Sequence, residues 1–128
     1  MRVLLDTHAF LWWNTDDSRL SQVARDVIAD GRNDVYLSVA SGWEIAIKAA
    51  RGSLVLPEPP GQYVPSRLQH HHIMPLPVQL EHVLRVYDLP MIHRDPFDRL
   101  LIAQSQLEDL LILTADPEIV RYAVSVIW

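Results

Sequence analysis

The sequence predicts an α/β fold with a mainly parallel central sheet and helices on both faces. Short runs rich in Val, Leu and Ile alternate with longer stretches in which apolar residues recur every three or four positions. The stretches between the runs are long enough to hold crossover helices, which place successive strands parallel and in one sheet. A chain of 128 residues can bury a sizeable core, so we expect residues 1–128 to form a single domain.

The first half of the chain supplies two of the predicted strands. Val3–Leu5 is a buried strand, and Thr7–Trp13 is a short helix that follows it directly. Ser18–Ala29 has apolar residues at helical spacing and polar residues on the other face, which predicts a helix before the strand Val35–Ser38. Ser41–Ala50 is apolar on most sides and predicts a third helix.

Proline shapes the expectations for the middle of the chain. Pro57–Pro60 predicts a loop, and in the helix expected over Gln62–His71 the regular part should come late because of Pro65. Ile73–Pro77 contains two prolines, which favours a strand at the edge of the sheet.

The last part of the chain predicts two long helices, a short helix and two strands. In the first long helix, four apolar side chains share one face: Leu80, Val83, Leu84 and Tyr87. In chain order the expected elements are a helix over Val78–Leu89, a helix over Pro96–Glu108, a strand over Leu110–Thr114, a short helix over Pro117–Tyr122 and a strand over Val124–Ile127.

Composition limits the functions to consider. The net charge of −5, with one lysine and ten arginines, indicates that any bound nucleic acid is held through few phosphates, with metal ions offsetting the acids locally. The absence of cysteine excludes disulfides and thiolate metal sites and agrees with a cytoplasmic location. Asp6 comes too early for the apolar core of a signal peptide, and no long apolar run occurs, so we expect no membrane insertion.

Four carboxylates fall where an apolar stretch gives way to a predicted helix start: Asp6, Glu44, Asp98 and Asp116. The carboxyl ends of parallel strands lie along one edge of a sheet, so these side chains can converge there. Clustered carboxylates repel one another, and a divalent cation such as Mg²⁺ or Mn²⁺ is the usual reason that such a cluster persists. The pattern therefore predicts an acidic metal site, where a cation could activate a water for attack on phosphorus.

Helix capping is an alternative explanation for most of these acids. Asp95 and Asp116 each precede a proline, as N-cap residues often do. Ser41 and Glu44 have the spacing of a capping box, and Asp98 would lie in a first helical turn, where the dipole favours negative charge. Capping and metal binding do not exclude each other, so both interpretations stay open for the individual residues.

Four segments together resemble the successive motifs of PIN domains, and in particular those of VapC-like toxins from bacterial toxin–antitoxin pairs. The segments are Val3–His8, Ser38–Lys48, His93–Gln104 and Leu113–Asp116. The resemblance implies a three-layer α/β/α domain with a mainly parallel sheet. It also implies an endoribonuclease that depends on Mg²⁺ or Mn²⁺, with Asp6, Glu44, Asp98 and Asp116 as catalytic metal ligands. Proteins of this type typically form homodimers and are neutralised by an antitoxin protein.

Residues beside the four acids have supporting roles to be tested. Thr7 and Thr114 could orient carboxylates or waters, and Asp95 could be either a ligand or a helix cap. Arg94 and Arg99 are candidate contacts to RNA phosphate, with salt bridges to the acids as the alternative.

Two histidines lie beside the acids, and two other functions stay open for the chain. His8 and His93 could approach RNA, although ordinary polar packing is the simpler interpretation. A non-catalytic PIN-like binding module stays open as an alternative. An aspartyl-phosphate protein with Asp6 as nucleophile is less favoured, because His8 stands where a phosphatase needs a second acid and no lysine follows a late strand.

Overall fold

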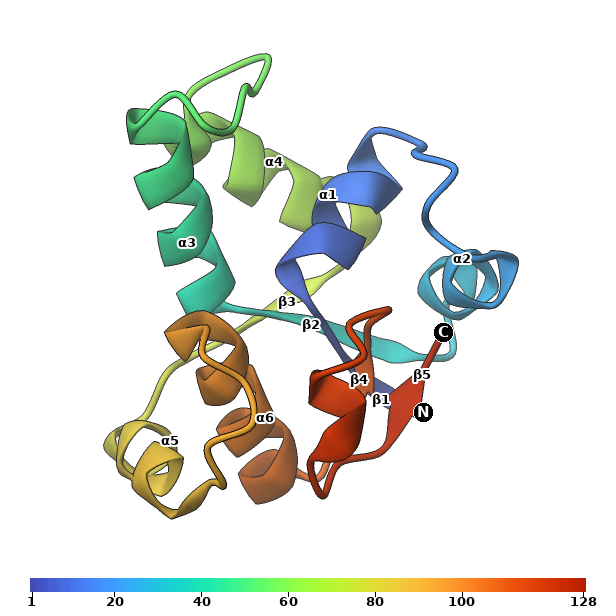
Figure 1. Cartoon of the computed structure of the whole chain (residues 1–128). Helices are drawn as coiled ribbons and strands as arrows, with labels where there is room; N and C mark the ends of the chain where they lie inside the picture. The colour runs from blue at the N-terminus through green and yellow to red at the C-terminus, as the bar shows by residue number, and fades with distance from the viewer.

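A computed structural model describes all residues, 1–128, and contains a five-stranded sheet in which every strand pair is parallel (Figure 1). The strands are β1 (Arg2–Leu5), β2 (Asp34–Ser38), β3 (Met74–Leu76), β4 (Leu111–Leu113) and β5 (Val126–Ile127). Their order is β3-β2-β1-β4-β5, so the proline-containing β3 lies at one edge, as its sequence predicts. The predicted parallel sheet is confirmed.

The strand register brings distant parts of the chain to one edge of the sheet. Leu5, the last residue of β1, pairs with Leu37 of β2 and with Leu113 of β4. Residues that follow these three strands therefore begin side by side at the carboxyl ends, where ligands bind in open parallel sheets.

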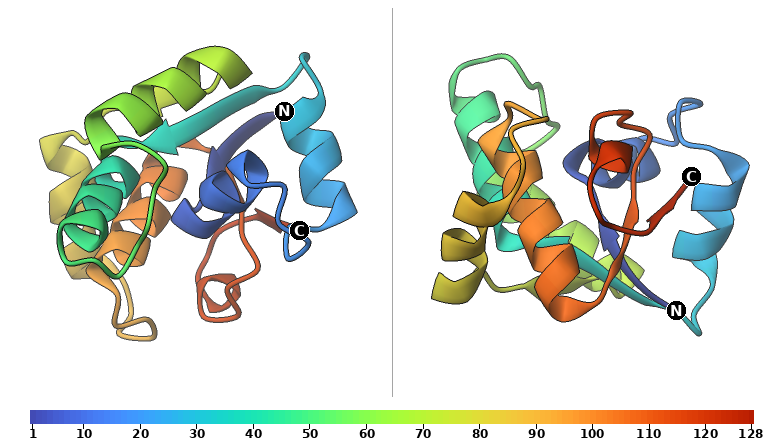
Figure 2. Two further views of the ribbon diagram at one scale, coloured as in Figure 1. Left: turned by 90° about the horizontal axis from the view of Figure 1, so that it is seen from above. Right: turned by 60° about the horizontal axis from the view of Figure 1, so that its bottom comes forward.

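Helices cover both faces of the sheet. They are α1 (Thr7–Asn14), α2 (Gln22–Ala29), α3 (Val39–Ala50), α4 (Pro60–His71), α5 (Leu80–Arg85) and α6 (Pro96–Glu108), with 3₁₀ turns η1 (Val86–Asp88) and η2 (Ile119–Arg121). The helices α1 to α4 lie on one side of the strands, and α5 and α6 lie on the other (Figures 1 and 2). The three-layer α/β/α architecture is therefore confirmed, and no helix is both long and apolar enough to cross a membrane.

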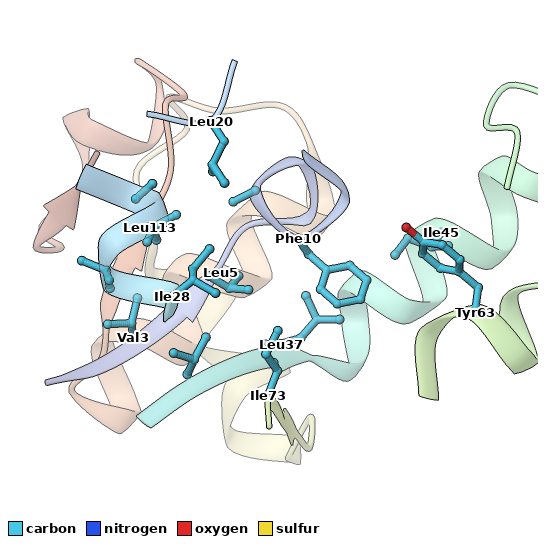
Figure 3. Packing of buried hydrophobic residues seen from close by; sticks show 14 residues of the cluster. Val3, Leu5, Phe10, Leu20, Ile28, Leu37, Ile45, Tyr63, Ile73 and Leu113 are labelled. Atoms are coloured by element: carbon cyan, nitrogen blue, oxygen red, sulfur yellow. The ribbon is translucent and has the colours of Figure 1, made fainter. Parts of the chain in front are cut away.

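Side chains of the central strand β1 alternate between two hydrophobic clusters, one on each face of the sheet. Val3 and Leu5 belong to the larger cluster, which also takes Phe10 from α1 (Figure 3). Leu4 points to the opposite face and packs with Leu101 of α6. Because Val3, Leu4 and Leu5 are fully buried, the acid that follows them starts in a region from which water is largely excluded.

Two helices have serine N-caps and begin at residues that differ from the predicted starts. α2 begins at Gln22, since the Ser21 hydroxyl accepts the backbone N–H of Ala24 at 3.0 Å. α3 begins earlier than predicted, because the Ser38 hydroxyl accepts the N–H of Ala40 at 3.0 Å. The predicted capping box at Ser41 and Glu44 is wrong, because both residues lie inside the helix and Glu44 is free to serve another purpose.

Proline does not delay α4 in the way the sequence suggests. The helix begins at Pro60, a position where the missing N–H costs nothing, and continues through Pro65. Pro65 is exposed, so water can reach the carbonyl that loses its usual donor.

The apolar face of the predicted helix over Val78–Leu89 is directed outward. Exposed fractions along this face run from 49% at Val83 to 93% at Tyr87, and the helix is divided into α5 and η1. The side chain turned inward is His82, which is fully buried and bonds Glu108 of α6 at 2.9 Å. The periodicity identified a shared face correctly, but other side chains attach this segment to α6: His82 by a hydrogen bond, and Val86 and Leu89 by packing in the cluster that contains Ile102 and Ala103.

Candidate metal centre

Asp6 is held by its own helix and by β4. It is the N-cap of α1, where its Oδ1 accepts the N–H of Ala9 at 2.7 Å, and its Oδ2 accepts the hydroxyl of Thr114. Only 6% of the residue is exposed. Burial raises the pKa of Asp6, although the bonds from Thr114 and Ala9 act in the opposite direction.

Glu44 approaches from α3 and is 4% exposed. The Thr7 hydroxyl donates to Oε1 at 2.7 Å, and the Lys48 ammonium donates to Oε2 at 2.6 Å. The Thr7 hydroxyl also lies 2.9 Å from that of Ser41. These contacts hold the Glu44 carboxylate in place and balance its charge by one cation.

Asp95 and Asp98 lie at the start of α6 and have different roles: Asp95 caps the helix, and Asp98 does not. Oδ1 of Asp95 accepts the N–H groups of Phe97 at 2.8 Å and Asp98 at 3.2 Å, which is N-cap geometry. The Asp98 carboxylate has no such backbone bond. Burial, together with the charges of Asp95, Glu44 and Asp6, raises the pKa of Asp98 to about 7 against the lowering influence of His93.

His93 contacts two of the four acids, Asp98 and Asp116. Its Nε2 lies 2.8 Å from Oδ2 of Asp116 and 3.1 Å from Oδ2 of Asp98. Its Nδ1 accepts the N–H of Asp95 at 3.1 Å, so Nε2 carries the proton and donates to the carboxylates. Burial lowers the pKa of His93, but the bond to Asp116 and the nearby acids outweigh it and raise the value.

The sequence did not single out His93 in this role. Ordinary polar packing was the simpler expectation, but the imidazole lies within the acid cluster. The available signal was its position two residues before Asp95, at the start of the motif His93–Gln104.

Asp116 and Asp6 are linked through one hydroxyl. The N–H of Asp116 donates to Oγ1 of Thr114 at 3.0 Å, while the same hydroxyl donates to Asp6. Oδ1 of Asp116 accepts the N–H of Glu118 at 2.8 Å, which leaves Oδ2 directed at His93. Each of the two threonine hydroxyls thus contacts one carboxylate of the cluster, Thr7 that of Glu44 and Thr114 that of Asp6.

Arg99 is not available for the expected phosphate contact. It is 7% exposed, and its guanidinium donates to the carbonyls of Val86 at 3.0 Å and Pro90 at 2.8 Å and to the Tyr122 hydroxyl at 3.1 Å. The same hydroxyl accepts the N–H of His93 at 2.7 Å. Arg99 and Tyr122 therefore position the loop that carries His93, and the phosphate assignment for Arg99 is wrong.

Arg94 has the opposite environment. It is exposed and makes no side-chain hydrogen bond or salt bridge, so its charge is free beside the acid cluster.

The donor set fits a hard divalent cation. His93, Asp98 and Asp116 place ligand atoms within 4.8 Å of one another, and the charges of Asp6 and Glu44 act on Asp98. Apart from His93, the groups available at the centre are carboxylate oxygens, which Mg²⁺ and Mn²⁺ prefer. Burial first, and then the charges of Asp95, Glu44 and Asp6, raise the pKa of Asp98, and a cation held beside it would favour the ionised carboxylate.

Comparisons with known proteins agree with this architecture. Residues 3–125 match the family model described as PIN domain. A segment of 58 residues is 45% identical to Ribonuclease VapC16 of Mycobacterium tuberculosis, covering 45% of this chain and 41% of that protein. The chain therefore aligns with less than half of the length of this curated relative.

Two solved structures share the fold at low sequence identity. VapBC2 from Rickettsia felis, solved with a DNA fragment from the promoter, matches with a TM-score of 0.68 at 11% identity over 99% of this chain and 98% of that chain. A toxin–antitoxin complex from Klebsiella pneumoniae matches with a TM-score of 0.66 at 16% identity over 98% and 96%.

Proposed function

The chain belongs to the PIN-domain family, and from this premise we propose that it is a metal-dependent endoribonuclease that acts as the toxin of a toxin–antitoxin pair. Support comes from the relative named as a ribonuclease and from structural neighbours described as toxin–antitoxin complexes. The substrate is RNA, and the reaction is hydrolysis of a phosphodiester bond.

The observation that carries this proposal is the gathering of four carboxylates at one sheet edge, with the pKa of Asp98 raised to about 7. Structural caps alone do not account for it, because Asp98 makes no cap and Asp95 already serves that purpose. Asp6, Glu44 and Asp98 are the principal ligands for Mg²⁺ or Mn²⁺, with Asp116 in support.

The residues of the chain divide the work of the site. A divalent cation held by these residues would lower the pKa of a bound water and offset negative charge on the leaving oxygen. Thr7 and Thr114 fix the carboxylates of Glu44 and Asp6 by hydrogen bonds, which keeps the ligands in position. Arg94, whose charge is unpaired, is the candidate for the scissile phosphate.

The remaining parts of the proposal concern assembly and location. Residues 1–128 act as one PIN domain, pair into a homodimer and bind a cognate antitoxin protein. The site of action is the cytoplasm, where RNA is available.

The test is cleavage of RNA by the purified chain after removal of any co-expressed partner. We expect cleavage in Mn²⁺ or Mg²⁺ and none in EDTA. Asp98→Asn should lower the rate by about 100-fold or more, because removing one ligand charge forfeits several kcal/mol of transition-state stabilisation. Asp30→Asn changes a half-buried acid paired with Arg32, remote from the acid cluster in the sequence, and should leave the rate unchanged.

Calorimetric titration with Mn²⁺ separates this function from a non-catalytic binding module. Saturable binding that is weakened in Asp98→Asn supports the metal centre. Absence of both Mn²⁺ binding and RNA cleavage would overturn the proposal.

A further inference from the structure

Lys48 and Glu44 form an ion pair at the metal centre. Nζ of Lys48 lies 2.6 Å from Oε2 of Glu44, and the two residues are one turn apart on α3. The Glu44 side chain is 5% exposed and that of Lys48 is 35% exposed. Because the distance is short and the carboxylate is buried, the attraction is strong and little screened by salt.

No other basic side chain contacts Glu44. Lys48 is the only lysine of the chain. The other basic side chain among the acids is His93, which lies at Asp98 and Asp116. The Arg99 guanidinium donates to backbone carbonyls of a loop. In the metal-free protein, the charge of Glu44 is therefore balanced by Lys48 alone.

Glu44 and Asp98 differ in how open their oxygens are to a cation. Both oxygens of Glu44 already accept a hydrogen bond, Oε1 from Thr7 and Oε2 from Lys48. In Asp98 only Oδ2 has a protein partner, which is His93. A divalent cation at Oε2 of Glu44 would be repelled by an ammonium already within hydrogen-bonding distance of that oxygen. A cation at Oδ1 of Asp98 meets no such contact.

We propose that the Lys48 ammonium takes the place of a second metal ion at Glu44, so that the centre binds one divalent cation and not two. The inference rests on the proposed metal-dependent function and specifies how many ions it uses. Centres with two metals hold them about 4 Å apart and offset charge on both the attacking and the leaving oxygen. In this chain a fixed ammonium, which does not exchange with solvent ions, supplies part of that positive charge. Lys48 is thus a positioning residue that acts through Glu44.

The experiment counts Mn²⁺ ions in the full-length protein. Metal-free protein is titrated with MnCl₂ in a calorimeter at physiological salt, and the Mn²⁺ electron paramagnetic resonance spectrum is recorded at saturation. The wild type should bind one Mn²⁺ and give the spectrum of an isolated ion. Lys48→Met keeps the aliphatic stem but leaves a buried carboxylate without its cation. This variant should bind two Mn²⁺, and magnetic coupling between ions about 4 Å apart should broaden the spectrum.

Two further variants separate the ion pair from other causes. Lys48→Arg keeps a cation beside Glu44 and should still bind one Mn²⁺. Arg51→Met removes an equal charge at the end of the same helix, where Arg51 is exposed and makes no side-chain hydrogen bond or salt bridge, and it should also bind one. A coupled pair of ions in Lys48→Met cannot result from misfolding, because misfolding would separate the carboxylates.

The outcomes distinguish this inference from the function on which it rests. If the wild type binds no Mn²⁺, the proposed function fails. If the wild type already binds two ions, or if Lys48→Met still binds one, only the role of Lys48 is overturned. Loss of all Mn²⁺ binding in Lys48→Met would also overturn it, because Lys48 would then support the first ion instead of excluding a second. A second ion in Arg51→Met would have the same consequence, since the count would then follow overall charge.

Discussion

Replacing Asp98 with asparagine is expected to stabilise the metal-free protein at pH 8 and to have little effect near pH 5. The pKa of Asp98 is raised from 3.8 to about 7 in the folded protein. An acid whose folded pKa is raised contributes stability that is fully present below the unfolded value and is lost as pH rises through the folded value. The wild type should therefore lose more stability across this range than the asparagine variant, which lacks this carboxyl.

The size of the stability change follows from the pH range in which the folded Asp98 carboxyl is protonated and the unfolded one is not. Between pH 5 and about 7 the unfolded carboxyl is ionised while the folded one is still protonated, and each pH unit corresponds to 1.36 kcal/mol. The wild type should lose about 3 kcal/mol between pH 5 and pH 8 on this account. The Asp98 side chain is 19% exposed, so solvent screening reduces this figure only modestly. The raised pKa of His93 changes stability in the same direction, which adds to the wild-type loss.

The assay is urea unfolding in EDTA at pH 5, 6, 7 and 8 for the wild type and Asp98→Asn. Asp30→Asn is the control, because the hydrogen bonds from Arg32 hold the pKa of Asp30 at about 2 and its charge does not change in this window. Parallel pH dependence in the wild type and Asp98→Asn would refute the reasoning, since the crowded carboxylates would then carry no electrostatic cost.

Three further substitutions test individual contacts. Thr114→Val keeps the shape but removes the hydroxyl donated to Asp6, so Mn²⁺ affinity measured by calorimetry should fall about 10-fold or more; unchanged affinity would contradict the positioning role. Tyr122→Phe leaves the buried Arg99 with one acceptor fewer and should cost about 1–3 kcal/mol in urea unfolding, whereas a neutral result would show that the loop is held by other contacts. Leu84→Ser lies on the exposed face of α5 and should change stability by less than about 0.5 kcal/mol; a core-sized loss would mean that this face is covered.

The strands were predicted from local sequence patterns, and the structure contains them. The buried run before Asp6 forms β1, and the prolines of β3 place it at an edge, because a strand without enough N–H donors cannot pair on both sides. Asp95 was left open between ligand and cap, and its bonds to Phe97 and Asp98 are those of a cap.

The roles of Glu44 and Arg99 depended on contacts with residues that are distant in the sequence. Glu44 has capping-box spacing, but the earlier cap at Ser38 places it inside α3 next to Thr7. Arg99 follows an acid in the motif, yet its position on α6 directs it to backbone carbonyls of a loop.

The sequence by itself determined the α/β class, the parallel sheet and the four carboxylates that follow its elements, because periodicity and strand–helix order are local properties of the chain. Only the tertiary structure decided that His93 donates between Asp98 and Asp116, and that the apolar face of α5 is directed away from the core. Helical spacing states which side chains share a face, but burial and hydrogen bonding depend on the element packed against that face. That information resides in contacts between residues far apart in the chain.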